Sequence, residues 1–92
     1  MKVYELLNTP DRWTQGTAAR DAQGLPVDRA HRAHARTWCL LGALDTCYPV
    51  CAAYEAAVRT VRRHLRTSID GWNDAPERTW DDVYALATTL DV

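Results

Sequence analysis

The chain has 92 residues, which is enough for one domain and too few for two independent hydrophobic cores. Lysine and arginine total 11 against 12 for aspartate and glutamate, so the formal net charge at pH 7 is -1 and no overall field directs the chain to DNA or to a membrane. Apolar residues make up 47% and charged residues 25%, a mixture that indicates a globular protein and excludes disordered and collagen-like chains.

The sequence shows neither a signal-peptide pattern nor a membrane-spanning run. The first residues lack an apolar signal core, and no stretch approaches the roughly 20 apolar residues that cross a bilayer. The cysteines, Cys39, Cys47 and Cys51, are odd in number, whereas a small secreted domain held by disulfides normally carries an even number. We therefore expect a soluble, cytoplasmic protein with reduced thiols.

The first 27 residues predict two short helical pieces and then a small β-hairpin. The apolar spacing over residues 3–7 predicts a short helix, and residues 9–11 are typical of a capped helical turn with proline at its first position. Within residues 13–27, the Asp-Ala-Gln-Gly sequence at 21–24 suits a tight turn with glycine in the left-handed region. Because an isolated hairpin is marginal in water, we expect it to pack against the helices.

A long helix is predicted from Asp28, a residue type that caps helices, to about Asp45. Its first half is amphipathic, and residues 38–44 are apolar all round, which is typical of a helix covered on more than one side. On this helix the small residues form a strip that lets another backbone approach closely. The strip consists of Ala35, Cys39, Gly42 and Ala43.

The strongest helical pattern follows Pro49, a residue that suits the first turn of a helix. Its apolar stripe consists of Val50, Tyr54, Ala57, Val58, Val61 and Leu65. A polar connection over residues 67–78 comes next, from which Ile69 and Trp72 should point inward. Thr79 and the acidic residues after it then predict a capped final helix. The outline is a single α+β domain over residues 1–92, mostly helical, with about four helices and one small hairpin near residues 13–27.

Three short motifs each begin with a tryptophan: Trp-Thr-Gln-Gly at 13–16, Trp-Cys-Leu-Leu-Gly-Ala-Leu at 38–44 and Trp-Asn-Asp at 72–74. In this order they resemble a family of small uncharacterised bacterial and bacteriophage proteins with W-T-Q-G, W-C-x-x-G-A-L and W-N-D motifs. The resemblance covers most of the chain from Trp13 onward and implies no activity. The signature that it implies consists of Trp13, Gln15, Gly16, Trp38, Cys39, Gly42, Trp72, Asn73 and Asp74. Whether this signature forms a core or a site stays open.

Cys39 is the strongest candidate for a catalytic nucleophile. A nucleophilic thiol needs a base, usually histidine, and an orienting Asn or Asp, and the chain supplies three histidines besides Asn73 and Asp74. A position inside a helix opposes this role, because thiol hydrolases expose the nucleophile where backbone N–H groups form an oxyanion hole. We therefore predict that Cys39 is a buried, unreactive thiol. The spacing of Cys47 and Cys51 does not match paired zinc ligands, so we predict no metal site and no cofactor.

The predicted loop around Trp72, Asn73 and Asp74 is a second candidate, because loops on a rigid scaffold often carry function. Asn and Asp side chains also bond to nearby backbone groups, so the same residues suit a structural tie. Gln15 beside a glycine in a predicted strand leaves the same two alternatives. The candidate residues for binding a ligand or partner are Gln15, Cys39, Trp72, Asn73 and Asp74.

The arginines of the third predicted helix are the one candidate nucleic-acid interface, formed by Arg59, Arg62, Arg63 and Arg66. Residues 29–66 carry a local charge of +5, and residues 70–92 carry a local charge of -5. We expect the arginines to be a solvated face, since the acidic segment has the size and sign to cancel their field and no stacking aromatics accompany them.

The sequence favours a small non-catalytic binding or accessory protein of the adaptor type, from a bacterium or phage. The sequence does not identify the partner: a protein is one candidate, nucleic acid is a less favoured one, and no membrane contact is expected. Two alternatives stay open. One is a thiol-dependent enzyme that uses Cys39 with a histidine and Asn73 or Asp74, and the other is a nucleic-acid binder that uses the face from Arg59 to Arg66.

Overall fold

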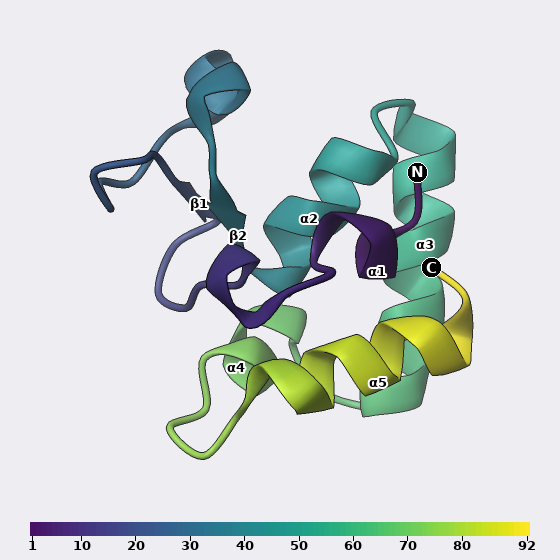
Figure 1. Ribbon diagram of the computed structural model, residues 1–92. Helices are drawn as coiled ribbons and strands as arrows, with labels where there is room; N and C mark the ends of the chain where they lie inside the picture. Colours follow the sequence, from purple (N-terminus) through teal and green to yellow (C-terminus); the bar gives the residue numbers. More distant parts are fainter.

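The computed structural model covers residues 1–92 and consists mainly of helices (Figure 1). The α-helices are α1 (Val3–Leu6), α2 (Leu40–Cys47), α3 (Cys51–Leu65), α4 (Ile69–Asn73) and α5 (Trp80–Leu90). The 3₁₀ helices are η1 (Pro10–Arg12) and η2 (Arg29–His34), and the strands are β1 (Ala19–Arg20) and β2 (Thr37–Trp38). The predicted fold class, mostly helical with a small antiparallel sheet, is confirmed. None of the helices combines the length and apolar character needed to span a bilayer.

The main partner of β1 lies further along the chain than the predicted hairpin of residues 13–27. β1 runs antiparallel to β2, with Ala19 opposite Trp38. The turn expected at residues 21–24 does form, and Gly24 at its end has a φ of 82°. After the turn, however, the returning chain makes a single bridge between Arg20 and Pro26. The turn at residues 21–24 and η2 project outward, whereas β1 and β2 lie next to the start of α2 (Figure 1).

The prediction of one long helix over residues 28–45 is wrong for the residues before Leu40. Asp28 caps only η2, where it accepts a hydrogen bond from the N–H of His31, and the chain then becomes extended. The reason is a tertiary partner that the helical pattern does not reveal. The N–H of Arg36 donates to the carbonyl of Arg20 at 2.7 Å, and the N–H of Cys39 donates to that of Ala18 at 3.0 Å. These bonds hold residues 36–39 in the extended conformation, so α2 begins only at Leu40.

The close backbone approach expected at the small residues occurs at Gly42. A methyl group on this residue would lie 2.0 Å from the carbonyl oxygen of Ala18, far inside van der Waals contact. Gly42 therefore lets the segment before β1 lie directly on α2. This contact fixes the loop of residues 13–18 over the first turn of α2.

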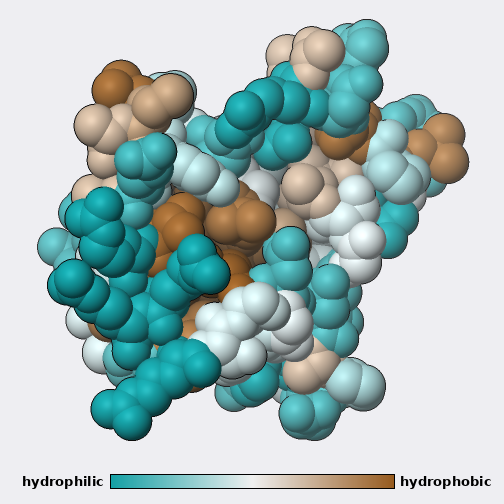
Figure 2. All heavy atoms as spheres, turned by 180° about the vertical axis from the view of Figure 1, so that it is seen from behind, coloured by the Kyte–Doolittle hydropathy of each residue, from teal (hydrophilic) through white to brown (hydrophobic).

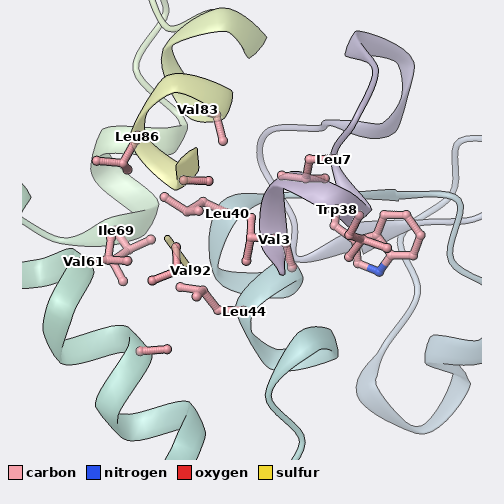
Figure 3. Packing of buried hydrophobic residues seen from close by; sticks show 14 of the residues in the cluster. Val3, Leu7, Trp38, Leu40, Leu44, Val61, Ile69, Val83, Leu86 and Val92 are labelled. Atoms are coloured by element: carbon pink, nitrogen blue, oxygen red, sulfur yellow. The ribbon is translucent and has the colours of Figure 1, made fainter. Parts of the chain in front are cut away.

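The core lies where α1, α3, α4 and α5 meet on α2. Figure 3 shows Leu40 near the centre of this cluster, between side chains of α1, α4 and α5. Of the stripe predicted for α3, Ala57 and Val61 are buried, whereas Val50 is 65% exposed because it lies outside the helix as its N-cap. The remaining buried apolar residues include Val3, Leu7, Leu44, Ile69, Val83 and Val92.

The C-terminal half follows its predicted capping pattern. Thr79 and Asp82 form a reciprocal capping box at the start of α5, as expected. The connection over residues 67–78 contains the short helix α4, which Ser68 caps and which the sequence pattern did not predict. The two ends of the chain lie side by side (Figure 1), and the N–H of Val3 donates to the carbonyl of Val92 at 2.9 Å.

Candidate functional site

The first and third tryptophan motifs meet at Asn73, which is fully buried at the end of α4. Its Oδ1 accepts hydrogen bonds from Trp13 Nε1 at 2.8 Å and from the N–H of Leu40 at 3.0 Å. Its Nδ2 donates to the carbonyl of Thr14 at 3.2 Å and to Asp74 Oδ1 at 2.9 Å. One side chain therefore ties the 13–16 loop, α2 and α4 together, and we call this set of contacts the Asn73 junction.

Gln15 and Gly16 extend the Asn73 junction toward the surface. Gln15 Nε2 donates to the carbonyls of Asn73 at 2.8 Å and Ala75 at 3.0 Å. The N–H of Gly16 donates to Asp74 Oδ1 at 3.0 Å, and its φ of 84° explains why glycine stands there. The amide of Gln15 and the carboxylate of Asp74 are thus used within the protein.

Trp72 lies beside the Asn73 junction and packs against the core, as its predicted inward direction implies, but it is only half-buried. The Arg78 guanidinium lies over its ring, with the carbon of the guanidinium 4.1 Å from the ring centroid. Arg78 Nε also donates to the Trp72 carbonyl at 2.8 Å, so the stacked pair is held from two sides. Of the five predicted binding residues, Gln15, Asn73 and Asp74 come together, and Trp72 flanks them.

Cys39 does not lie inside a helix. It is the N-cap of α2, and its Sγ accepts a hydrogen bond from the N–H of Gly42 at 3.3 Å. The residue is nonetheless only 3% exposed, which agrees with the predicted burial. Burial raises the pKa of the Cys39 thiol, the N–H of Gly42 opposes that shift, and the carboxylates of Asp70 and Asp74 add to it.

The structure does not bring a histidine to Cys39. The small cavity of about 110 Å³ that it lines also includes Asp70 and Asp74 but no histidine. His31, His34 and His64 are all exposed, on η2 and α3. No group of three or more His, Cys, Asp or Glu side chains is placed to hold a metal ion.

The molecule also has a concave face, formed by one side of α3 with α2 and α4. An apolar hollow of about 270 Å³ has Leu41, Val58 and Ile69 among its lining residues. Along α3 it continues into a shallower depression beside Arg59 and Arg63. We call this surface the α3 groove; its other lining residues include Tyr54, Glu55, Arg62 and Asp70. Figure 2 shows an apolar hollow on the rear face, bordered by hydrophilic side chains.

The arginines of the α3 groove are free of ion pairs. Arg59, Arg62 and Arg63 are exposed, and none lies within 4.0 Å of a carboxylate. Glu55, one turn before Arg59, does not pair with it. In the acidic C-terminal segment, Asp82 pairs with Arg78 and Asp91 with Lys2, and Asp70 lines the groove without an ion pair. None of these carboxylates forms an ion pair with the arginines of the groove.

The comparisons with known proteins give a family without an assigned role. A family of unknown function, DUF6197, matches residues 2–90. The chain belongs to this family. No curated protein and no solved structure matches the chain. Membership of a family of unknown function agrees with the resemblance to an uncharacterised family, and the three motifs as its signature and the bacterial or phage origin stay predictions.

Sequence reasoning missed the apolar floor of the α3 groove. Tyr54 and Val58 were assigned to the core stripe of α3, and both lie only partly buried at its edge. The one sequence signal for this surface was Leu41. It belongs to a segment that is apolar all round, and the core covers only part of such a helix.

Proposed function

We propose that this protein is a non-catalytic binding protein of the accessory type, and that its α3 groove holds an acidic amphipathic helix of a partner protein. A single observation carries the proposal: an open apolar hollow adjoins three arginines that have no acidic partner in the structure. Helix-in-groove recognition uses this combination of an apolar floor and a charged rim.

The apolar floor supplies affinity. Leu41, Tyr54 and Val58 are partly buried, and they lie beside the fully packed core without being covered by it. Apolar side chains of a bound helix, at i, i+3, i+4 and i+7, would remove this surface from water. Each Å² of apolar surface so covered contributes about 25 cal/mol before the costs of association.

The charged rim supplies specificity. Arg59 and Arg63 lie one turn apart on α3, with Arg62 beside them, so carboxylates spaced at helical intervals match them. An acidic flank therefore fits this rim, and a basic flank is repelled by it. Asp70 lies on the other side of the hollow, which favours a helix that is acidic on one flank only.

The thiol-enzyme alternative finds less support. Cys39 is buried, and its raised pKa keeps the thiol protonated at neutral pH. A nucleophile also needs a base within hydrogen-bond reach, whereas the Cys39 sulfur has a backbone N–H as its partner. We therefore propose a binding role for the protein.

The test is a fluorescence titration with a designed helical peptide of about 16 residues, long enough to sample a helix. The peptide carries Leu at i, i+3, i+4 and i+7 and Glu on one flank, and a second version carries Lys instead of Glu. We expect saturable binding of the acidic version, weakened about tenfold by Arg62→Glu. The matched control is Arg12→Glu, an exposed and unpaired arginine outside the groove, which should leave the affinity unchanged.

Three results would contradict the proposal. The first is equal binding of the two peptides, and the second is an equal loss of affinity in the Arg62 and Arg12 variants. The third is a tight complex with duplex DNA whose log-affinity falls with log-salt at a slope of about -3.6, the value for four neutralised phosphates. That slope would assign Arg59, Arg62, Arg63 and Arg66 to nucleic acid.

A further inference from the structure

A second concave site lies at the amino-terminal end of α3, where η2 and α2 come close to it. It has a volume of about 430 Å³. We call it the Arg32 pocket, and the residues that matter for its chemistry are Arg29, Arg32, Asp45, Pro49, Cys51 and Tyr54.

Arg32 is the unusual residue of this pocket. Its side chain is only 18% exposed, and its Nε and Nη1 are buried with no hydrogen-bond partner. The nearest carboxylate oxygen, Asp45 Oδ2, lies 3.6 Å from Nη1, which is an ionic contact but too long for a hydrogen bond. Buried guanidinium groups are normally hydrogen-bonded, so this one has unused donors at the edge of an open site.

Asp45 does not neutralise the pocket. Its carboxylate also pairs with Arg29, which donates to both of its oxygens. One carboxylate therefore serves two guanidinium groups, and the three side chains keep a net charge of +1. An added anion would complete the charge balance of this set.

The amino-terminal end of α3 and the hydroxyl of Tyr54 supply further hydrogen-bond donors that favour an anion in the pocket. The N-cap residue is Val50, whose side chain cannot accept a hydrogen bond, so the first turn of this 15-residue helix has no side-chain cap. Tyr54 lies at the end of that turn and lines the pocket. Burial, together with the charge of Asp45, raises the pKa of its hydroxyl, which therefore stays protonated and able to donate.

We infer that the Arg32 pocket binds a small oxyanion, a phosphate or carboxylate group, with Arg32 as its main ligand. The guanidinium group of Arg32 is held by no hydrogen bond, so it is free to turn two N–H groups toward such an anion. This site shares Tyr54 with the α3 groove but has its own charged residues, and the inference does not depend on the proposed function.

The test follows the side-chain Nε–Hε signal of Arg32 by NMR while sodium phosphate, or separately sodium acetate, is added at constant ionic strength. We expect a saturable shift, and the anion with the lower dissociation constant identifies the preferred ligand class. Arg32→Gln should abolish saturable binding, observed then at the amide of Cys51. Arg12→Gln, a matched change at an exposed arginine that lines neither the Arg32 pocket nor the α3 groove, should leave the dissociation constant unchanged.

Asp45→Asn separates a binding role from a purely structural one. Removal of the competing carboxylate raises the net charge of the site, so the affinity for the anion should rise at least about threefold. Melting curves of both variants show whether each is folded. A shift that stays linear with anion concentration in the wild type, or weaker binding in folded Asp45→Asn, would overturn the inference.

Discussion

Asn73 uses all four hydrogen-bonding positions of its side-chain amide in the folded protein. A buried residue with this many partners joins segments that no apolar contact could fix in register. The donors and acceptors come from the 13–16 loop, from the first turn of α2 and from the next residue in the chain. The motif residues around Asn73 therefore fit a structural role better than a ligand site.

Asn73→Ala should lower the free energy of unfolding by about 3 kcal/mol, because it leaves Trp13 Nε1 and the N–H of Leu40 buried without acceptors. Chemical denaturation measures the change. The control is Asp74→Asn, which keeps an oxygen to accept from Gly16 and should cost less than about 1 kcal/mol. Equal stability of the Asn73→Ala and wild-type proteins would show that the junction is not structural.

The three thiols should differ strongly in reactivity. Cys51 is exposed, Cys39 is enclosed, and burial raises the pKa of Cys47 to about 11. Because the thiolate is the reactive form, an alkylating reagent at neutral pH should modify Cys51 first. Raising the pH to 9 should leave Cys47 slow, since its thiolate fraction grows only as the pH approaches 11. Mass spectrometry of timed samples identifies the site, and early labelling of Cys39 would favour the thiol-enzyme alternative.

At the scale of the elements, α3 and α5 could be predicted from the sequence, because each carries its own signals. α3 has a long apolar stripe and α5 has a capping box, and neither depends on a distant partner for its type. The segment 28–39 could not be predicted, because its extended part is held by β1 and Ala18. The same holds for the α3 groove, since a residue at the edge of an apolar stripe has the same spacing whether it is covered or open.

Gly42 tests the packing of the 13–18 loop on α2. Gly42→Ala should destabilise the protein by about 3 kcal/mol, because the new methyl group meets a backbone carbonyl that cannot turn away. The gain in helix propensity is only about 1 kcal/mol and cannot offset the clash. Gly71→Ala is the comparison: its methyl group would meet the Ser68 hydroxyl, which can turn away at the cost of its cap hydrogen bond, so the loss should be smaller, about 1 kcal/mol. Thermal unfolding compares them, and a Gly42→Ala protein as stable as the wild type would contradict the contact.

Substitutions of Trp38 and Trp72 test which of the two side chains contributes more to the core. Trp38 is 7% exposed and Trp72 is half-buried, so Trp38→Ala should cost about 3–5 kcal/mol and Trp72→Ala clearly less. Trp38→Phe keeps most of the packing, and the indole N–H of Trp38 makes no hydrogen bond, so this change should cost little. Denaturation curves rank the variants. A larger loss for Trp72 than for Trp38 would reverse the assignment.

For the whole molecule, residues 29–66 carry a net positive charge and residues 70–92 a net negative charge, yet the arginines of α3 form no ion pair. The strands β1 and β2 lie next to α2 and η2 pairs with Asp45 of α2, whereas the arginines of α3 line an open apolar hollow (Figure 2). A fold that is neutral overall thus presents a locally basic and partly apolar surface. Such a surface suits a partner of matching shape and opposite charge more than a long polyanion.

The most direct test of this account is to map where the acidic helical peptide binds on the isotope-labelled protein by NMR. The backbone amides of Leu41, Val58 and Ile69 should shift in a saturable way, together with that of Arg62, whereas the amides of Gln15 and Trp72 should stay in place. Shifts centred on the Asn73 junction would contradict the account, because they would make the tryptophan motifs the binding site and the α3 groove an ordinary surface.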